Sequence, residues 1–170
     1  MNFYFPNDSF SLENLLAGKI NQKNFTDSEK YIVTYVQNWF SGFKHFHFQT
    51  SGSTGNPKSI QLSREQLAYS ASSTLDFLYP NSKPSNLLLC LNPKFIGGTQ
   101  VITRAILADA DLIYREPSST PLKPTERVDL VSMVPLQVKT ILNEDPRLFD
   151  KVGTVLIGGA ELDEKIRQRL

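Results

Sequence analysis

Residues Thr50 to Lys58 read Thr-Ser-Gly-Ser-Thr-Gly-Asn-Pro-Lys. Glycine lets the backbone approach an anion closely, the hydroxyl groups add hydrogen-bond donors, and the lysine supplies a positive charge. This combination predicts a loop that binds a polyphosphate. The alternative interpretation is a flexible linker of serine and glycine, but a linker does not need a Pro-Lys ending between two patterned segments.

The spacing within the loop excludes the commonest type of phosphate loop. That loop has four residues between its glycines and a lysine directly after the second glycine. Here Gly52 and Gly55 are three positions apart, and Pro57 stands before Lys58. We therefore do not expect a Walker-type NTPase.

The segments on both sides of the loop predict a firm frame for it. Residues 43–49 alternate aromatic and polar side chains, which is typical of a half-buried strand, and residues 59–62 predict a short return strand. Ser63, followed three residues later by Gln66, has the form of a capping box that begins a helix reaching about residue 79. His45 and His47 share one face of the first strand. The two histidines either form a polar strand face or bind a metal ion together, and no third ligand at suitable spacing supports the metal site.

From residue 80 onward, predicted strands and helices alternate. The expected strands span residues 86–91, 111–114, 128–134 and 152–157, and the expected helices span residues 95–110, 136–143 and 162–170. Residues 116–124, rich in Pro, Ser and Thr, are expected to form a surface connection. This order predicts an α/β fold with a mostly parallel sheet, flanking helices and right-handed crossovers.

The chain divides into two expected parts. Residues 1–42 are expected to form a helical lead-in, with a helix that begins at Thr26 or Asp27 and continues through Trp39. Residues 43–170 are expected to form an α/β nucleotide-binding portion. Ligands of parallel sheets bind beyond the carboxyl ends of the strands. Because residues 50–58, 92–98, 133–137 and 158–160 each follow a predicted strand, we expect these four segments to meet at one edge.

Composition narrows the classes of partner. The 170 residues are 40% hydrophobic with a formal charge of +1, and Lys and Arg are spread along the chain, so a small-molecule ligand is expected and a nucleic acid is not. The single cysteine, Cys90, lies in an apolar run and is expected to be structural. No leader or membrane span is visible in the sequence, and we expect a cytoplasmic protein without a membrane partner; a homo-oligomer and a monomer both stay open.

At residues 50–58 the chain resembles the adenylate-forming acyl-CoA synthetases and ligases, whose phosphate-loop signature [ST]-[ST]-G-[ST]-T-G-x-P-K is matched at every position. Within this superfamily the chain is most similar to the o-succinylbenzoate–CoA ligases of menaquinone biosynthesis. The segments that carry this similarity are Leu91–Gly98, Met133–Gln137 and Ile157–Ala160. The resemblance covers about residues 45–170 and implies part of the large N-terminal domain of such an enzyme, incomplete at its carboxyl end.

The resemblance implies a two-step reaction. The carboxylate of the acid, o-succinylbenzoate by this resemblance, attacks the α-phosphorus of ATP to give an acyl-adenylate and pyrophosphate, and coenzyme A then displaces AMP. The implied partners are the acid, ATP and coenzyme A, with Mg²⁺ held mostly by groups outside this chain. The family's catalytic lysine is expected beyond residue 170, so the 170-residue chain alone is expected to be inactive. The alternatives are a ligase for another aryl or fatty acid and a non-catalytic nucleotide-binding module.

The resemblance also implies roles for individual residues. The ATP phosphates would be held by Thr50, Ser51, Gly52, Ser53, Thr54, Gly55 and Lys58. The adenine would lie along Gly158, Gly159 and Ala160, although a Gly-Gly pair is also common in tight turns. The acyl pocket would be lined by Phe95, Gly97, Gly98 and Pro135. The succinylbenzoate ligases often have His where Phe95 stands, and a phenyl ring cannot donate a hydrogen bond to a substrate; core packing of Phe95 is the other interpretation.

Overall fold

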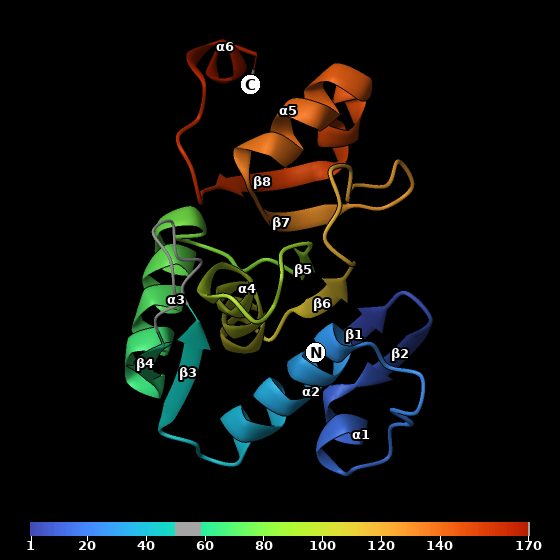
Figure 1. Cartoon of the computed structure of the whole chain (residues 1–170), viewed down its shortest axis with the longest axis vertical. Coiled ribbons are helices and arrows are strands. Elements are labelled where there is room, and N and C mark those ends of the chain that lie inside the picture. The colour runs from blue at the N-terminus through green and yellow to red at the C-terminus, as the bar shows by residue number, and fades with distance from the viewer. Residues whose placement is uncertain (50–58, 170) are drawn as a thin grey trace.

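The computed structural model describes residues 1–49 and 59–169 and shows a six-stranded sheet with a separate two-stranded one (Figure 1). The order of the large sheet is β2-β1-β6-β5-β7-β8. Its strands are β1 (Asn2–Phe5), β2 (Asp8–Ser11), β5 (Asn86–Leu89), β6 (Asp111–Tyr114), β7 (Val128–Met133) and β8 (Val152–Ile157). All neighbouring pairs are parallel except β1 and β2, which are antiparallel. The predicted α/β fold with a mostly parallel sheet is confirmed.

The central strand β5 contributes to two hydrophobic cores, one on each face of the sheet. Leu87 and Leu89 pack into a core together with the helices α2 (Asp27–Phe40) and α4 (Ile96–Ala108). Leu88 and Cys90 pack into a second core with α5 (Pro135–Glu144). Because successive side chains point to opposite faces and both faces are covered, residues 87–90 are apolar at every position, as expected for a strand buried on both sides. The remaining helices are α1 (Leu12–Leu16), α3 (Arg64–Leu78), the 3₁₀ helix η1 (Pro146–Lys151) and α6 (Glu164–Arg167).

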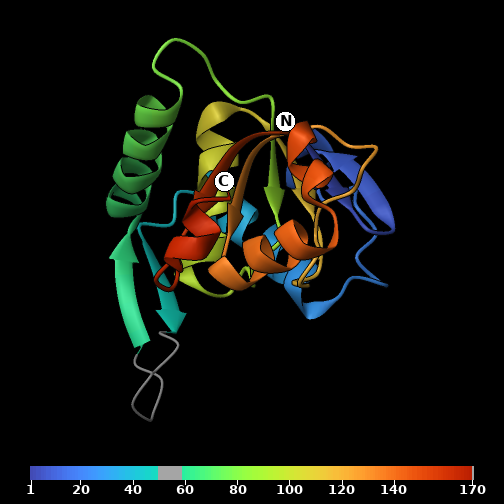
Figure 2. The ribbon, with the colours of Figure 1, turned by 90° about the horizontal axis from the view of Figure 1, so that it is seen from above.

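A separate antiparallel hairpin flanks residues 50–58. Its strands are β3 (His45–Gln49) and β4 (Ser59–Ser63), in which Gln49 pairs with Ser59. Figures 1 and 2 show the hairpin and α3 on the outer side of α4, away from the large sheet. The predicted capping box is confirmed, because the Gln66 N–H donates to Ser63 Oγ at 3.1 Å and the Ser63 N–H donates to Gln66 Oε1 at 2.8 Å. The predicted alternation is also confirmed, since Phe46 and Phe48 are buried while His45 and His47 are exposed.

The lead-in differs from the expected helical segment. The helix α2 is present, and a capping box that joins Thr26 and Glu29 begins it, but residues 2–11 form the β1–β2 hairpin. Strand β1 pairs with β6, so the first residues belong to the same sheet as residues 86–157. Phe3 and Phe5 are buried in that sheet and supply the apolar face that supports the pairing.

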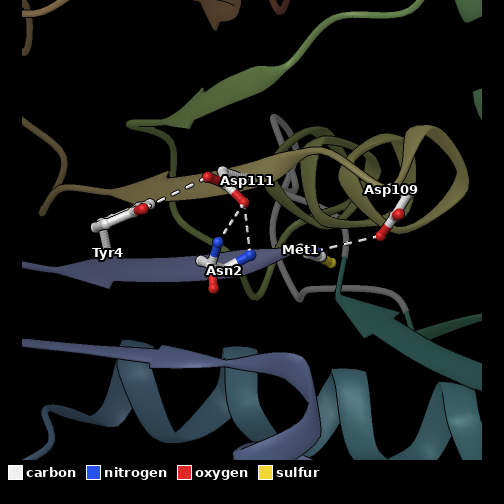
Figure 3. Close-up of polar contacts among 5 residues, drawn as sticks. All are labelled: Met1, Asn2, Tyr4, Asp109 and Asp111. Atoms are coloured by element: carbon white, nitrogen blue, oxygen red, sulfur yellow. Dashed lines mark hydrogen bonds and ion pairs between the residues drawn. The ribbon is translucent and has the colours of Figure 1, made fainter.

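Asp109, which follows α4, and Asp111, the first residue of β6, fasten β1 to the sheet (Figure 3). Asp111 accepts hydrogen bonds from the backbone N–H of Asn2 at 2.6 Å and from its side-chain amide at 3.1 Å. The ammonium group of Met1 lies 3.3 Å from a carboxylate oxygen of Asp109. Charge-assisted bonds of this kind are stronger than neutral ones, so they add to the short two-residue ladder between β1 and β6.

Over the described residues, no helix combines the length and the apolar character needed to cross a bilayer.

Candidate functional site

The large sheet has a point where the direction of its winding reverses. From β5 the chain passes through α4 to β6 on one side, while β7 lies on the other side of β5. In the described structure, the β5–β7 ladder contains the pairs Leu87–Leu130 and Leu88–Val131. Adjacent parallel strands that lead in opposite directions open a crevice beyond their carboxyl ends, and this is where ligands of such sheets bind.

A cavity of about 580 Å³ occupies this crevice. Its walls come from the end of β5, the first three turns of α4, the end of β7, and the end of β8 with the turn that follows it. The described lining residues are Leu91, Asn92, Phe95, Ile96, Gly97, Gly98, Gln100, Arg104, Ser132, Met133, Val134, Leu156, Gly158 and Gly159. Three of the four segments that were expected to meet therefore do so.

The cavity is mainly apolar but contains one buried cation. Arg104 is 7% exposed, and among the described lining residues it is the only charged side chain. Its guanidinium donates to Ser132 Oγ at 3.5 Å, and its Nε has no hydrogen-bond partner within the described structure. Burial lowers the pKa of Arg104, but an arginine stays protonated in proteins. No carboxylate of residues 1–49 or 59–169 forms an ion pair with it. A buried charge without a counter-ion is costly, so an anionic ligand would stabilise it.

Gln100 lies one helical turn before Arg104 on α4 and is 8% exposed. Its Oε1 atom is also buried without a partner among the described groups. The cavity thus has a strong donor and an acceptor on one helix face, and the apolar side chains of Phe95 and Ile96 also line it.

The start of α4 packs against the turn that follows β5. A Cβ atom at Gly98 would lie 2.8 Å from the carbonyl carbon of Asn92 and 2.9 Å from Cα of Pro93, and closer still to the carbonyl oxygen of Asn92. Thr99 fixes the same turn through a 2.7 Å hydrogen bond from its hydroxyl to the Pro93 carbonyl. The absence of a side chain at Gly98 therefore sets how close the wall of the cavity lies to the helix.

The turn after β8 forms the opposite wall. Gly158 donates its N–H to the Met133 carbonyl at 3.0 Å, and Gly159 has φ of 87°, which favours glycine. Both glycines line the cavity, whereas Ala160 and Pro135 are not among its described lining residues. Pro135 is the first residue of α5, and Val134 before it takes the lining position.

A second cavity of about 500 Å³ adjoins the first. The two share the lining residues Asn92 and Phe95. The remaining described lining residues of the second are Tyr31, His47, Phe48, Ser59 and Lys94. Phe95 is 38% exposed and contributes to both cavities, so it lies at their junction rather than in the core.

The structure supports a packing role for Cys90. Its side chain is fully buried, and its thiol donates to the Ser132 carbonyl at 3.4 Å. Burial raises the pKa of Cys90 to about 12. Because the thiolate is the reactive form, this cysteine is not a nucleophile near neutral pH.

The proposed phosphate-binding residues, Thr50 to Gly55 and Lys58, lie outside the described residues. Their flanking strands β3 and β4 pair with each other and not with the large sheet. That residues 50–58 meet the other three segments at one edge therefore stays a prediction.

Sequence reasoning missed Gln100, Arg104 and Ser132. A signal for Arg104 was present, because it is the only charged residue between Ile96 and Ala108 in an otherwise mostly apolar helix. Charged residues are almost never fully buried unless they are paired.

The comparisons with known proteins agree with this arrangement. A family model described as AMP-binding enzyme matches residues 47–170. Among solved structures, an acyl-CoA synthetase (AMP-forming)/AMP-acid ligase II-like protein from Dyadobacter fermentans is 30% identical with a TM-score of 0.76, covering 89% of this chain and 44% of that one. No curated protein matches significantly.

Two further structures share the fold at lower identity. One is a variant of MenE from E. coli with bound OSB-AMS, at 24% identity and a TM-score of 0.60 over 72% of this chain and 27% of that one. The other is the o-succinylbenzoate coenzyme A synthetase MenE from Bacillus subtilis in complex with AMP, at 19% identity and a TM-score of 0.60 over 72% and 26%. The chain thus spans less than half the length of each of these proteins.

Proposed function

Because the chain belongs to the family of AMP-binding enzymes, we propose that it forms the acid- and ATP-binding part of an acid–CoA ligase that activates o-succinylbenzoate or a closely similar aryl acid. The observation that carries this proposal is the apolar cavity at the reversal point of the sheet, with the buried Arg104 in its wall, whose Nε has no partner among the described groups. An apolar wall suits an aromatic ring, and the guanidinium suits a second carboxylate.

o-Succinylbenzoate has the matching chemistry. It carries one carboxylate on its ring and another at the end of its keto side chain. If the ring carboxylate pairs with Arg104, the side-chain carboxylate remains free to attack ATP. Phe95, in the wall of the cavity, would pack against the ring rather than donate a hydrogen bond. The proposal extends to a role in menaquinone biosynthesis, which rests on the resemblance of residues 91–98, 133–137 and 157–160 to the o-succinylbenzoate–CoA ligases.

We propose that ATP lies with its phosphates on Thr50 to Gly55 and Lys58, and its adenine along Gly158 and Gly159. Attack of the carboxylate oxygen on the α-phosphorus forms the acyl-adenylate and breaks the bond to pyrophosphate. Bringing an anion to a polyanion requires positioning and positive charge rather than covalent chemistry by the protein. The thiol of coenzyme A then attacks the acyl carbon and AMP leaves; the second cavity, which meets the first at Phe95, offers a separate approach for it.

Mg²⁺ would neutralise the phosphates during the first step. Within residues 1–49 and 59–169 no group of three or more His, Cys, Asp or Glu side chains could hold a metal ion. The proposal therefore has Mg²⁺ bound chiefly by the phosphates, with further ligands from outside the 170 residues. It also keeps the expectation that the 170-residue chain alone does not complete the adenylation.

Calorimetric titration of the chain with o-succinylbenzoate tests the acid-binding role. We expect Arg104→Met to weaken binding by about tenfold or more, since hydrogen bonds to charged groups contribute about 1.5–3 kcal/mol. Arg127→Met is the matched control, because Arg127 is 82% exposed and outside the cavity. The analogue 4-oxo-4-phenylbutanoate keeps the keto side chain but lacks the ring carboxylate, so it should not lose more affinity with Arg104→Met than with the control. Equal binding of o-succinylbenzoate to both variants would contradict the proposal.

A further inference from the structure

The side chain of Gln137 links three segments that meet beside the cavity. Gln137 is 5% exposed and lies in the first turn of α5. Its Oε1 accepts from the Val134 N–H at 3.1 Å, and its Nε2 donates to the Cys90 carbonyl at 3.2 Å and to the Ser118 carbonyl at 2.8 Å. All three partners are backbone groups, so the side-chain amide fixes the backbone positions of three separate segments.

Two of these partners adjoin opposite walls of the cavity. Cys90 precedes the lining residues Leu91 and Asn92, and Val134 itself lines the other wall. The described ladder between β5 and β7 contains no pair beyond Leu88 and Val131. Past this point side-chain groups bind the segments that follow β5 and β7. The Cys90 thiol donates to the Ser132 carbonyl, and the Gln137 amide donates to the Cys90 carbonyl. Of these two, the Gln137 amide is a stronger donor than the Cys90 thiol.

The third partner brings in the connection between β6 and β7. Ser118 belongs to this connection, which Arg115 holds through hydrogen bonds to the Pro121 carbonyl and the Glu126 carboxylate, and which buries Leu122. The hydrogen bonds of Arg115 thereby hold the two ends of this mainly irregular connection together, and the Ser118 carbonyl between them binds Gln137. The carbonyl groups of Cys90 and Ser118 would each lose a donor without the amide, which makes the contact costly to remove.

We propose that Gln137 is a positioning residue for the cavity, which sets the separation of the Asn92 and Val134 walls and so the affinity for the acid. The effect on the acid rests on the proposed function, whereas the effect on the walls does not. Gln137 does not itself line the cavity, and it therefore acts through the backbone of both walls.

Amide NMR spectra of the chain without ligand provide the first test. In Gln137→Met, which keeps the length of the side chain, we expect the signals of Leu91, Asn92 and Gly98 to shift. Thr140→Val is the matched control, because Thr140 also lies on α5 and donates only to the Leu136 carbonyl at 2.9 Å. If Gln137→Met moves these signals no more than the control does, the positioning role is overturned, whatever ligand the cavity takes.

Titration with o-succinylbenzoate and ATP provides the second test. We expect Gln137→Met to weaken binding of the acid by about three- to tenfold, because a small displacement of both walls spoils complementarity, with ATP affinity changed by less than about twofold. Equal losses for both ligands would overturn the proposal. If the wild-type chain binds no o-succinylbenzoate, the proposed function fails, and the ligand-free spectra still decide the role of Gln137.

Gln137→Glu separates the role of the amide donor from general damage to the fold. The carboxylate keeps an acceptor for Val134 but cannot donate to Cys90 or Ser118, and protonation at low pH restores one donor. Affinity of this variant for the acid, relative to wild type at the same pH, should therefore rise as the pH falls from about 8 to about 5.5. A constant ratio over this range would contradict a role for the donated bonds.

Discussion

Substitution of Gly98 by alanine is expected to disturb both the stability of the chain and the shape of its cavity. The added methyl group would lie 2.8–2.9 Å from backbone atoms of Asn92 and Pro93, where ordinary contacts begin at 3.4 Å. The turn or the helix must therefore move by at least about half an ångström, and overpacking of this kind costs about 1–3 kcal/mol. Movement also strains the bond from Thr99 to Pro93, so we expect a loss of about 2–4 kcal/mol in the free energy of unfolding.

Urea unfolding followed by the fluorescence of Trp39 measures this loss, since the only tryptophan is 3% exposed in the core. Gly97→Ala is the matched control, because its Cβ would meet only Leu91 Cδ1 at 3.8 Å. Its stability should change by less than about 1 kcal/mol, the range of the difference in helix propensity. Equal stability of the two variants would refute the view that backbone contact at Gly98 limits the cavity.

Three further changes test other parts of the structure. Ser63→Ala should lower the free energy of unfolding by about 1 kcal/mol through loss of the helix cap, while the exposed mid-helix change Ser73→Ala should not, as urea titration would show. Gly159→Ala should lower the free energy of unfolding by about 1–2 kcal/mol, because φ of Gly159 is 87°. Gly158→Ala is the control, since a Cβ at Gly158 meets nothing within 4 Å, and equal melting temperatures of the two variants would contradict this prediction. Cys90 keeps its proton in the folded state up to a pKa of about 12, so its contribution to stability should be complete below pH 9 and decline as the pH rises from about 9 to 12. Stability measured across this range should fall less steeply in Cys90→Ala.

Elements with strong local signals were predictable from the sequence. The strands 111–114 and 152–157 have the predicted bounds. The capping box at Ser63 was predicted, and Thr26 was one of the two residues expected to begin α2. Such features depend on residues that are close in the sequence, so a short window contains the information that decides them.

Features set by distant partners were not predictable in the same way. Residues 2–5 form a strand because β6 offers them an edge, and Asn2 is 109 positions away from Asp111. The cavity depends similarly on three separate strand ends. The burial of Arg104 was the exception, because one charge in a mostly apolar helix is itself informative, but only the fold shows that the side chain lines a cavity.

The parallel pairing of β1 with β6 has a consequence for how the chain reaches its native state. During synthesis β1 emerges long before β6, the strand with which it pairs. The side chains of Phe3 and Phe5, which are buried in the folded chain, therefore stay unburied while more than a hundred residues are translated. Contacts between such distant positions form slowly, because the intervening chain must first be brought together. We therefore expect the amino-terminal hairpin to dock late, and nascent chains that stop before Asp111 to leave these phenylalanines accessible to chaperones.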